Sequence, residues 1–199
     1  IDGLQKKMVS SGKGRTTCSY FLPDGSRIIY ASTHEASPDC PPPPPRTGGY
    51  FWAVYSSFEI YSAKPYGSDL KRLTDSPGYD AEATVSPNAK KIVFTSERDG
   101  DLELYSMDAK GKNVKRLTHE PGYDGGAFFS PNGKMIVYRG SHPTDPKLVE
   151  RDKQYLKEHL VVPTVFEVWV MNADGSSKRQ VTKLNAASFA PYFTPDGKA

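Results

Sequence analysis

The sequence has 199 residues, 37% hydrophobic and 25% charged, which is enough for one domain with a sizeable core. Its 26 basic and 23 acidic residues are mixed along the chain and leave a net charge of +3, which argues against a nucleic-acid-binding surface. No stretch approaches the roughly 18 consecutive apolar residues of a membrane-spanning helix. The composition therefore favours a globular domain with neither nucleic acid nor a membrane span.

The chain begins at Ile1 and ends at Ala199, just after a turn signal, so we expect it to be a segment of a longer protein. Its two cysteines, Cys18 and Cys40, are 22 residues apart. Two interpretations are open: one disulfide, which would indicate an oxidising compartment, or two buried free thiols. Two cysteines alone do not make a zinc site, which needs three or four ligands.

A turn of Pro followed by Asp or Asn divides the chain into repeats. It begins at four prolines, spaced by 64, 44 and 64 residues: Pro23, Pro87, Pro131 and Pro195. A second marker, an apolar residue followed by Ser or Thr, recurs at the same spacings: Val9-Ser10, Leu73-Thr74, Leu117-Thr118 and Val181-Thr182. A third is an apolar–aromatic pair: Ile60-Tyr61, Leu104-Tyr105 and Val168-Trp169. Three independent markers with one period indicate a repeat of 44 residues, extended by about 20 in two of its copies.

Taken in chain order, residues 1–10 are interpreted as the end of an earlier repeat, with a last strand from Leu4 to Ser10. The first complete repeat, residues 11–74, carries an insertion at 35–57 that contains five consecutive prolines and a cluster of aromatic residues. Five prolines favour a stiff polyproline II segment. The insertion is either a docking ligand for a partner or, as we favour, a rigid loop packed on the domain by its aromatic residues. If exposed, these residues would form a binding surface: Tyr50, Phe51, Trp52 and Tyr55.

The second repeat, residues 75–118, has no insertion and shows the strand pattern most clearly. Short apolar or β-branched runs alternate with turn residues and predict four antiparallel strands, at 81–86, 91–96, 102–107 and 114–118. Proline sets the first corner of each hairpin and glycine supplies positive φ at a later one. Ala89 stands where the other repeats have glycine, so we expect a cost of about 1 kcal/mol if its φ is positive.

The third repeat, residues 119–182, carries an insertion at 142–163. Asp145-Pro146 is a helix start, Pro163 follows its end, and the apolar residues between them lie near one stripe. We therefore predict a short surface helix. Residues 183–199 begin a further repeat.

A repeat of about 44 residues with four strands predicts an all-β fold, a β-propeller of four-stranded antiparallel blades. We expect a single propeller segment over residues 1–199, with about three complete blades, two partial blades and one short helical insertion. Stacking covers both faces of a blade, which explains why the 91–96 run is continuously apolar rather than alternating. Three blades leave open faces, so further blades or a partner chain are expected to complete the propeller.

The repeat resembles that of the TolB-like β-propellers, called PD40. The resemblance lies in Ser86-Pro87-Asn88, Arg98-Asp99-Gly100, Leu104-Tyr105 and Leu117-Thr118, at matching spacings. It implies a periplasmic, secreted or cell-surface bacterial protein that binds another protein or a peptide. Similar blades also form the regulatory propeller of prolyl-oligopeptidase-type serine hydrolases. In that alternative, the catalytic domain lies outside this chain.

The loops that enter two blades repeat the pattern Pro-Gly-Tyr-Asp. Because the first strand of a blade lines the central channel of a propeller, these loops and the strand behind them predict a polar site at the channel mouth. Its candidate residues are Tyr79, Asp80, Glu82, Tyr123 and Asp124. The alternative is structural: a turn, an Asp cap and a tyrosine packed between blades.

Catalytic motifs are missing from the sequence. It contains no Gly-x-Ser-x-Gly elbow, zinc-protease helix, phosphate-binding loop, dinucleotide fingerprint or EF-hand loop. His34, Arg98 and His142 share one repeat position, and we expect them to bond backbone or a carboxylate rather than a metal. We therefore predict a binding scaffold that is not an enzyme and needs neither metal nor cofactor.

Overall fold

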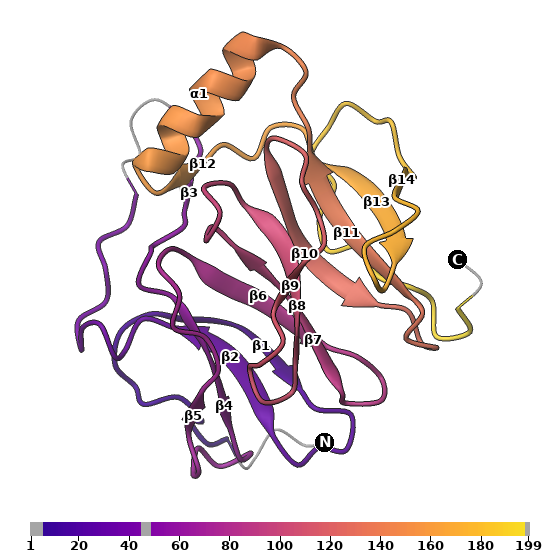
Figure 1. Ribbon diagram of the computed structural model, residues 1–199. Coiled ribbons are helices and arrows are strands. Elements are labelled where there is room, and N and C mark those ends of the chain that lie inside the picture. The colour runs from indigo at the N-terminus through magenta and orange to yellow at the C-terminus, as the bar shows by residue number, and fades with distance from the viewer. Residues whose placement is uncertain (1–5, 45–48, 198–199) are drawn as a thin grey trace.

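The computed structural model describes residues 6–44 and 49–197, and its main strands form three four-stranded antiparallel sheets (Figure 1). Blade one contains β1 (Thr16–Phe21), β2 (Ile28–Ser32), β4 (Glu59–Ala63) and β5 (Lys71–Arg72). Blade two contains β6 (Asp80–Val85), β7 (Lys91–Ser96), β8 (Glu103–Asp108) and β9 (Lys115–Arg116). Blade three contains β10 (Tyr123–Phe129), β11 (Met135–Ser141), β13 (Glu167–Asn172) and β14 (Arg179–Gln180).

The three blades follow one another around an axis, in the indigo-to-orange order of Figure 1. Their first strands lie innermost, where β6 contacts β1 on one side and β10 on the other. A parallel bridge between Leu102 and Tyr123 joins blades two and three. The predicted all-β propeller fold is confirmed, and the described residues form an open arc of blades.

Apolar side chains of the middle strands pack between neighbouring blades. Ile92 and Phe94 of β7 face blade one and share a buried cluster with Ile29. Val93, between them in sequence, faces blade three and packs in a cluster with Ile136. Full burial of each such side chain contributes roughly 1.5–3 kcal/mol. Successive residues of β7 are thus apolar because both faces of the strand are covered.

The repeated threonine stabilises the outer half of each blade. In blade one, the Thr74 hydroxyl accepts a bond from the Ile60 amide at 2.9 Å and donates one to the Glu59 carboxylate at 2.6 Å. Arg72 completes the cluster with a 2.6 Å ion pair to Glu59. Thr118 and Thr182 accept the same amide bond in the other blades, at 2.8 and 2.9 Å. The apolar-Thr marker is therefore a structural bond that ties the last strand to the third.

Glycines in the outer hairpins allow close contact between blades. Gly111 has a φ of +77°, and a Cβ there would lie 2.3 Å from the Leu73 carbonyl oxygen of blade one. Gly67 approaches the Val9 carbonyl in the same way, at 2.7 Å. Val9 thus takes the place of Leu73 although residues 6–10 form no strand. The predicted strand from Leu4 to Ser10 is wrong for its described part, and Leu4 itself lies outside the described residues.

We expect Gly111→Ala to lower the free energy of unfolding of the full-length protein by about 3 kcal/mol, measured by chemical denaturation. The methyl group would meet a backbone oxygen and would also strain the positive φ. Gly100→Ala is the matched control, because Gly100 has a φ of +87° but no atom within 4 Å of its added Cβ. The control should lose only about 1 kcal/mol. Equal losses in the two variants would contradict the contact between blades.

The two insertions pair with each other at one end of the blades, at the top of Figure 1. Strand β3 (Trp52–Ala53) of the first insertion pairs with β12 (Leu160–Val161) of the second. The predicted helix is present as α1 (Pro146–Lys157), capped by Asp145, whose carboxylate accepts the Lys147 amide. Among the described residues, no helix has both the length and the apolar character needed to cross a bilayer.

Candidate functional site

A β-bulge interrupts the innermost strand of each blade at one repeat position. The register shifts between Thr17 and Tyr20, between Ala81 and Thr84, and between Gly125 and Phe128. Each bulge holds a residue with positive φ, and the following segment has one at the same repeat position: Cys18 (51°), Glu82 (55°), Gly126 (58°) and Ala190 (49°). A bulge re-aims the side chain that it carries. All four positions consequently line one space on the propeller axis.

This axial cavity has a volume of about 220 Å³ and is lined mainly by apolar atoms. Tyr20 and Phe128 form part of its wall, with ring centroids 6.2 Å apart, and Tyr192 packs against Phe128 at 5.1 Å. These aromatic residues share a repeat position, two residues after the bulge. Thr84 occupies that position in blade two and bonds the Ala127 carbonyl instead. Three of the four equivalent positions thus present aromatic rings.

Glu82 provides the negative charge of the axial cavity. Its Oε2 accepts bonds from the Tyr123 hydroxyl at 2.7 Å, the Gly126 amide at 2.8 Å and the Thr95 hydroxyl at 3.0 Å. Its Oε1 accepts a 2.7 Å bond from Arg139. The Glu82 carboxylate therefore joins blade two to blade three, and protein groups donate all four of these hydrogen bonds.

Arg139 carries the matching positive charge inside a cage of aromatic rings. Its guanidinium carbon lies 5.0 Å from the Trp52 ring centroid and 5.5 Å from that of Tyr123, and Phe166 and Phe189 are at 6.0 and 5.9 Å. Burial alone would lower the pKa of Arg139, but the neighbouring Glu82 and Tyr123 have the larger effect and raise it above its usual value. A cation of the protein itself fills the aromatic cage.

Two residues predicted at the channel mouth are buried between strands instead. Asp80 is 0% and Asp124 1% exposed. Both Asp80 oxygens bond Arg98, at 3.0 and 3.2 Å, and Ser76 adds a 2.7 Å bond. The prediction of a polar mouth is therefore wrong for these two carboxylates, because each is buried beside its basic partner. Their arrangement matches the structural alternative.

The two predicted tyrosines are also buried. Tyr79 packs edge-on against Phe58 with ring centroids 5.8 Å apart, which agrees with the structural alternative. Tyr123 bonds Glu82 and stacks on Phe166 at 4.9 Å. Of the five predicted residues, only Glu82 lines the axial cavity directly. Tyr123 does not line it but holds Glu82 through its hydroxyl.

The basic residues at the shared repeat position bond polar side chains, close to what the sequence indicates. Arg98 bonds Asp80, and His142 Nε2 lies 2.8 Å from Asp124 Oδ1. His34 Nδ1 lies 3.0 Å from the Ser32 hydroxyl, which is neither backbone nor carboxylate. The difference arises because blade one has Thr16 where the other blades have aspartate.

The aromatic loop of the first insertion packs mostly on the propeller. Trp52 and Tyr55 pack against the buried cluster at this end of the blades, and Phe51 contacts Tyr155 of α1 at 5.3 Å. Tyr50 is exposed, at 72%. The rigid-loop interpretation fits these contacts, and of the four aromatic residues only Tyr50 is mostly exposed.

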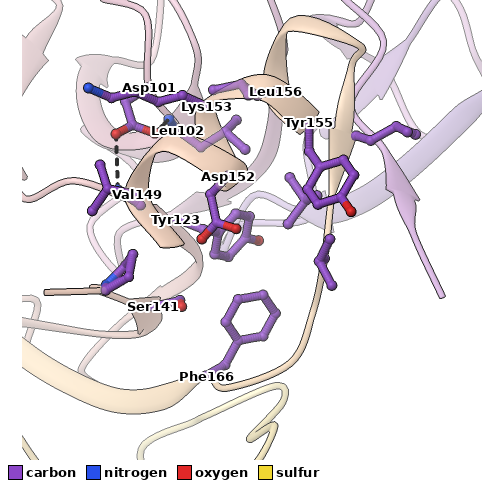
Figure 2. A pocket seen from close by; sticks show the side chains of 15 residues that line it. Asp101, Leu102, Tyr123, Ser141, Val149, Asp152, Lys153, Tyr155, Leu156 and Phe166 are labelled. Carbon is purple, nitrogen blue, oxygen red and sulfur yellow. Dashed lines mark hydrogen bonds between the residues drawn. The ribbon is translucent and has the colours of Figure 1, made fainter. Parts of the chain in front are cut away.

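A second, small cavity of about 40 Å³ lies beneath α1 (Figure 2). Tyr123 and Phe166 line it from the propeller side, and Val149, Asp152 and Leu156 line it from the helix. A space of this size holds a few water molecules at most. The insertion therefore covers the aromatic cage closely and leaves no room there for a larger ligand.

Both cysteines are free and exposed, so neither the disulfide nor two buried thiols describes them. The bulge at Cys18 aims its side chain into the axial cavity. Cys40 instead lies beside the guanidinium of Arg15. The two thiols therefore have different surroundings and form no disulfide.

Sequence reasoning found Glu82 but missed Arg139, Phe128 and Tyr20 as cavity residues. The bulge positions hold Cys, Glu, Gly and Ala, four residue types with no common chemistry. Aligning the repeats at the Pro-Asx turns would have placed Tyr20, Phe128 and Tyr192 at one position. That alignment was the available signal for an aromatic wall.

Comparison with known proteins agrees with this geometry. A family model described as the TolB beta propeller domain matches residues 54–166. A putative TolB from Agrobacterium tumefaciens is 20% identical with a TM-score of 0.63, and the match covers 97% of this chain and 57% of that one. TolB from Acinetobacter baumannii is 21% identical with a TM-score of 0.60, over 92% of this chain and 36% of the other.

A puromycin hydrolase has a TM-score of 0.55 at 11% identity, over 85% of this chain and 22% of its own. No curated protein matches the sequence. At these identities the solved structures show a shared fold, and this chain spans little more than half of the first of them. The family model covers more than half of the chain. This chain belongs to the TolB β-propeller domain family.

Proposed function

We propose that this chain is part of a non-catalytic propeller of the bacterial envelope or secreted space that binds a protein or peptide at its axial cavity. The observation that carries the proposal is the cavity wall, where aromatic rings from several blades surround one satisfied charge pair. Tyrosine and phenylalanine give large contact areas at low entropic cost. Tyr192 continues this wall through its ring contact with Phe128, at 5.1 Å.

The polar groups of the cavity support binding rather than chemistry. Glu82 already accepts four bonds from the protein, so it is not positioned as a free general base. Cys18 and Ser19 are the nucleophilic residues in the described lining, which includes no histidine to activate them. The wall is therefore suited to holding a side chain of a partner.

The proposed location follows from the family. Two of the solved structures compared above are TolB proteins, and the resemblance to this family implies a periplasmic or secreted platform for a protein partner. The open arc of blades also needs further blades or a partner chain to cover its ends. A protein or peptide, rather than nucleic acid, suits the mixed surface charge.

The test is site-specific photo-crosslinking in the full-length protein produced in bacterial cells. A photoreactive phenylalanine analogue at Tyr192 should capture one discrete protein partner. The same analogue at Leu70, 41% exposed in an outer hairpin, serves as the control and should not. Phe128→Ala should reduce capture from position 192 several-fold by removing the aromatic wall. Equal capture from both positions, or none from position 192, would reject the cavity as the binding site.

The alternative function is the regulatory propeller of a larger prolyl-oligopeptidase-type serine hydrolase. The fold similarity to a puromycin hydrolase favours it. A complete reading frame with a Gly-x-Ser-x-Gly motif and later Asp and His residues would support this alternative, as would peptide hydrolysis by the full-length protein.

A further inference from the structure

Blades two and three share an aspartate at the start of their first strands but differ at two positions beside it. Blade two has Ser76, Asp80 and Arg98, and there the two charges neutralise each other. Both oxygens of Asp80 accept bonds, from the Arg98 guanidinium and from the Ser76 hydroxyl. In blade two, the buried aspartate is therefore neutralised by a cation of the protein itself, the Arg98 guanidinium.

Blade three replaces the guanidinium by the shorter imidazole of His142. Its Nε2 lies 2.8 Å from Asp124 Oδ1, while Oδ2 of the same carboxylate has no hydrogen-bond partner among the described residues. Asp124 is 1% exposed, and buried polar atoms of native proteins are almost always bonded. The position therefore lacks the cation or donor that Arg98 and Ser76 supply in blade two.

The second difference adds a ligand atom. Glu120 stands in place of Ser76 and exchanges a hydroxyl donor for a carboxylate. One ligand atom from each of Glu120, Asp124 and His142 lies within 4.8 Å of the others. Lys178 bonds both Glu120 oxygens, at 2.7 and 2.8 Å, and the partly exposed Glu120 can keep one of these bonds while its other oxygen turns inward. Two carboxylates and one ammonium leave a negative charge beside the imidazole.

We propose that Glu120, Asp124 and His142 bind one divalent transition-metal ion, for which Zn²⁺ is the appropriate probe. One imidazole nitrogen and two carboxylate oxygens are ligands that Zn²⁺ accepts, at about 2.0–2.2 Å. Asp124 Oδ1 and His142 Nε2 are 2.8 Å apart and would separate to about 3.3 Å as neighbouring ligands of a tetrahedral ion. The metal would occupy the place that the Arg98 guanidinium takes in blade two.

Three protein ligands leave a coordination position for water or an anion. His142 also lines a pocket of about 460 Å³, whose wall carries both basic and acidic side chains. Glu120 gives access from the other side because its side chain is 40% exposed. The site is thus reachable from solvent although Asp124 is buried.

A competing explanation is that a protonated His142 simply forms an ion pair with Asp124, as Arg98 does with Asp80. The two explanations differ in one measurement, which is stoichiometric binding of Zn²⁺. An ion pair needs no metal, and a surface histidine binds Zn²⁺ only weakly.

The experiment is isothermal titration of the chelator-treated full-length protein with Zn²⁺. We expect one ion per chain for the wild type and at least about 100-fold weaker binding for His142→Arg, which restores the blade-two residue and should preserve the fold. His34→Arg is the matched control, because it changes the same repeat position in blade one, where no aspartate is present. This control should bind Zn²⁺ as the wild type does.

Glu120→Gln provides a second variant on a partly exposed residue and should weaken binding about 10-fold or more without loss of thermal stability. The proposal is overturned if the wild type binds no stoichiometric Zn²⁺ at about 100 µM free ion. Undiminished binding by folded His142→Arg or Glu120→Gln would overturn it as well. Because the readout is metal binding, its failure does not bear on protein capture at the axial cavity.

Discussion

Replacing Glu82 by glutamine is expected to lower the free energy of unfolding by about 3–4 kcal/mol. The substitution keeps the side-chain volume but leaves the Arg139 guanidinium buried without its counter-charge. It also turns an acceptor of four bonds into a group with its own donors, which would face the Tyr123 hydroxyl or the Gly126 amide. Chemical denaturation of the full-length protein measures the loss.

A double-mutant cycle separates the charge pair from its surroundings. Arg139→Met alone should also destabilise the protein, since it leaves the Glu82 carboxylate buried without its counter-charge. The double variant Glu82→Gln/Arg139→Met should lose less unfolding free energy than the sum of the two single losses. Asp152→Asn is the control for an exposed pair, because Asp152 and Arg151 have side chains 32% and 40% exposed. That control should change stability by less than about 1 kcal/mol. Additive losses for Glu82 and Arg139 would show that the pair is not coupled.

Stability is expected to decrease as the pH rises from about 4.5 to 7, because burial raises the pKa of Glu103 to about 7. The Arg116 guanidinium, bonded to Glu103 Oε1 at 2.7 Å, opposes the effect of burial without cancelling it. Glu103 therefore binds its proton more tightly in the folded state than in the unfolded state. This difference stabilises the native protein at low pH and is lost as the pH rises through the folded-state pKa of Glu103. The loss should be about 3 kcal/mol and complete above pH 7.

Glu103→Gln isolates this contribution, because glutamine does not titrate. Its unfolding free energy should show a smaller decrease between pH 5 and pH 8 than that of the wild type. Glu167 is the equivalent residue of blade three, and its pKa is lowered by the bond from Thr182. Glu167→Gln should therefore leave the decrease in place. If wild type and Glu103→Gln lose stability in parallel over this range, Glu103 is not the titrating group.

The sequence alone was enough to predict the propeller and its family. Pro-Asx turns and the Leu-Thr pairs act through bonds that are local or lie within one blade, such as the Thr74 bond to Ile60. Ala89 illustrates this as well, since its φ is +57°, as its place in the turn predicts. The helix of the second insertion was predicted from its cap, because Asp145 bonds an amide only two residues away.

Only the tertiary structure decided where the functional side chains meet. Glu82 and Arg139 are 57 residues apart and come from different blades. Trp52 reaches Arg139 because β3 pairs with β12 of a distant insertion. The predicted mouth carboxylates Asp80 and Asp124 turned out to be buried, because strand register brings Arg98 and His142 beside them. Repeat spacing determines backbone geometry within each blade, whereas the contacts between blades depend on which side chains stacking brings together.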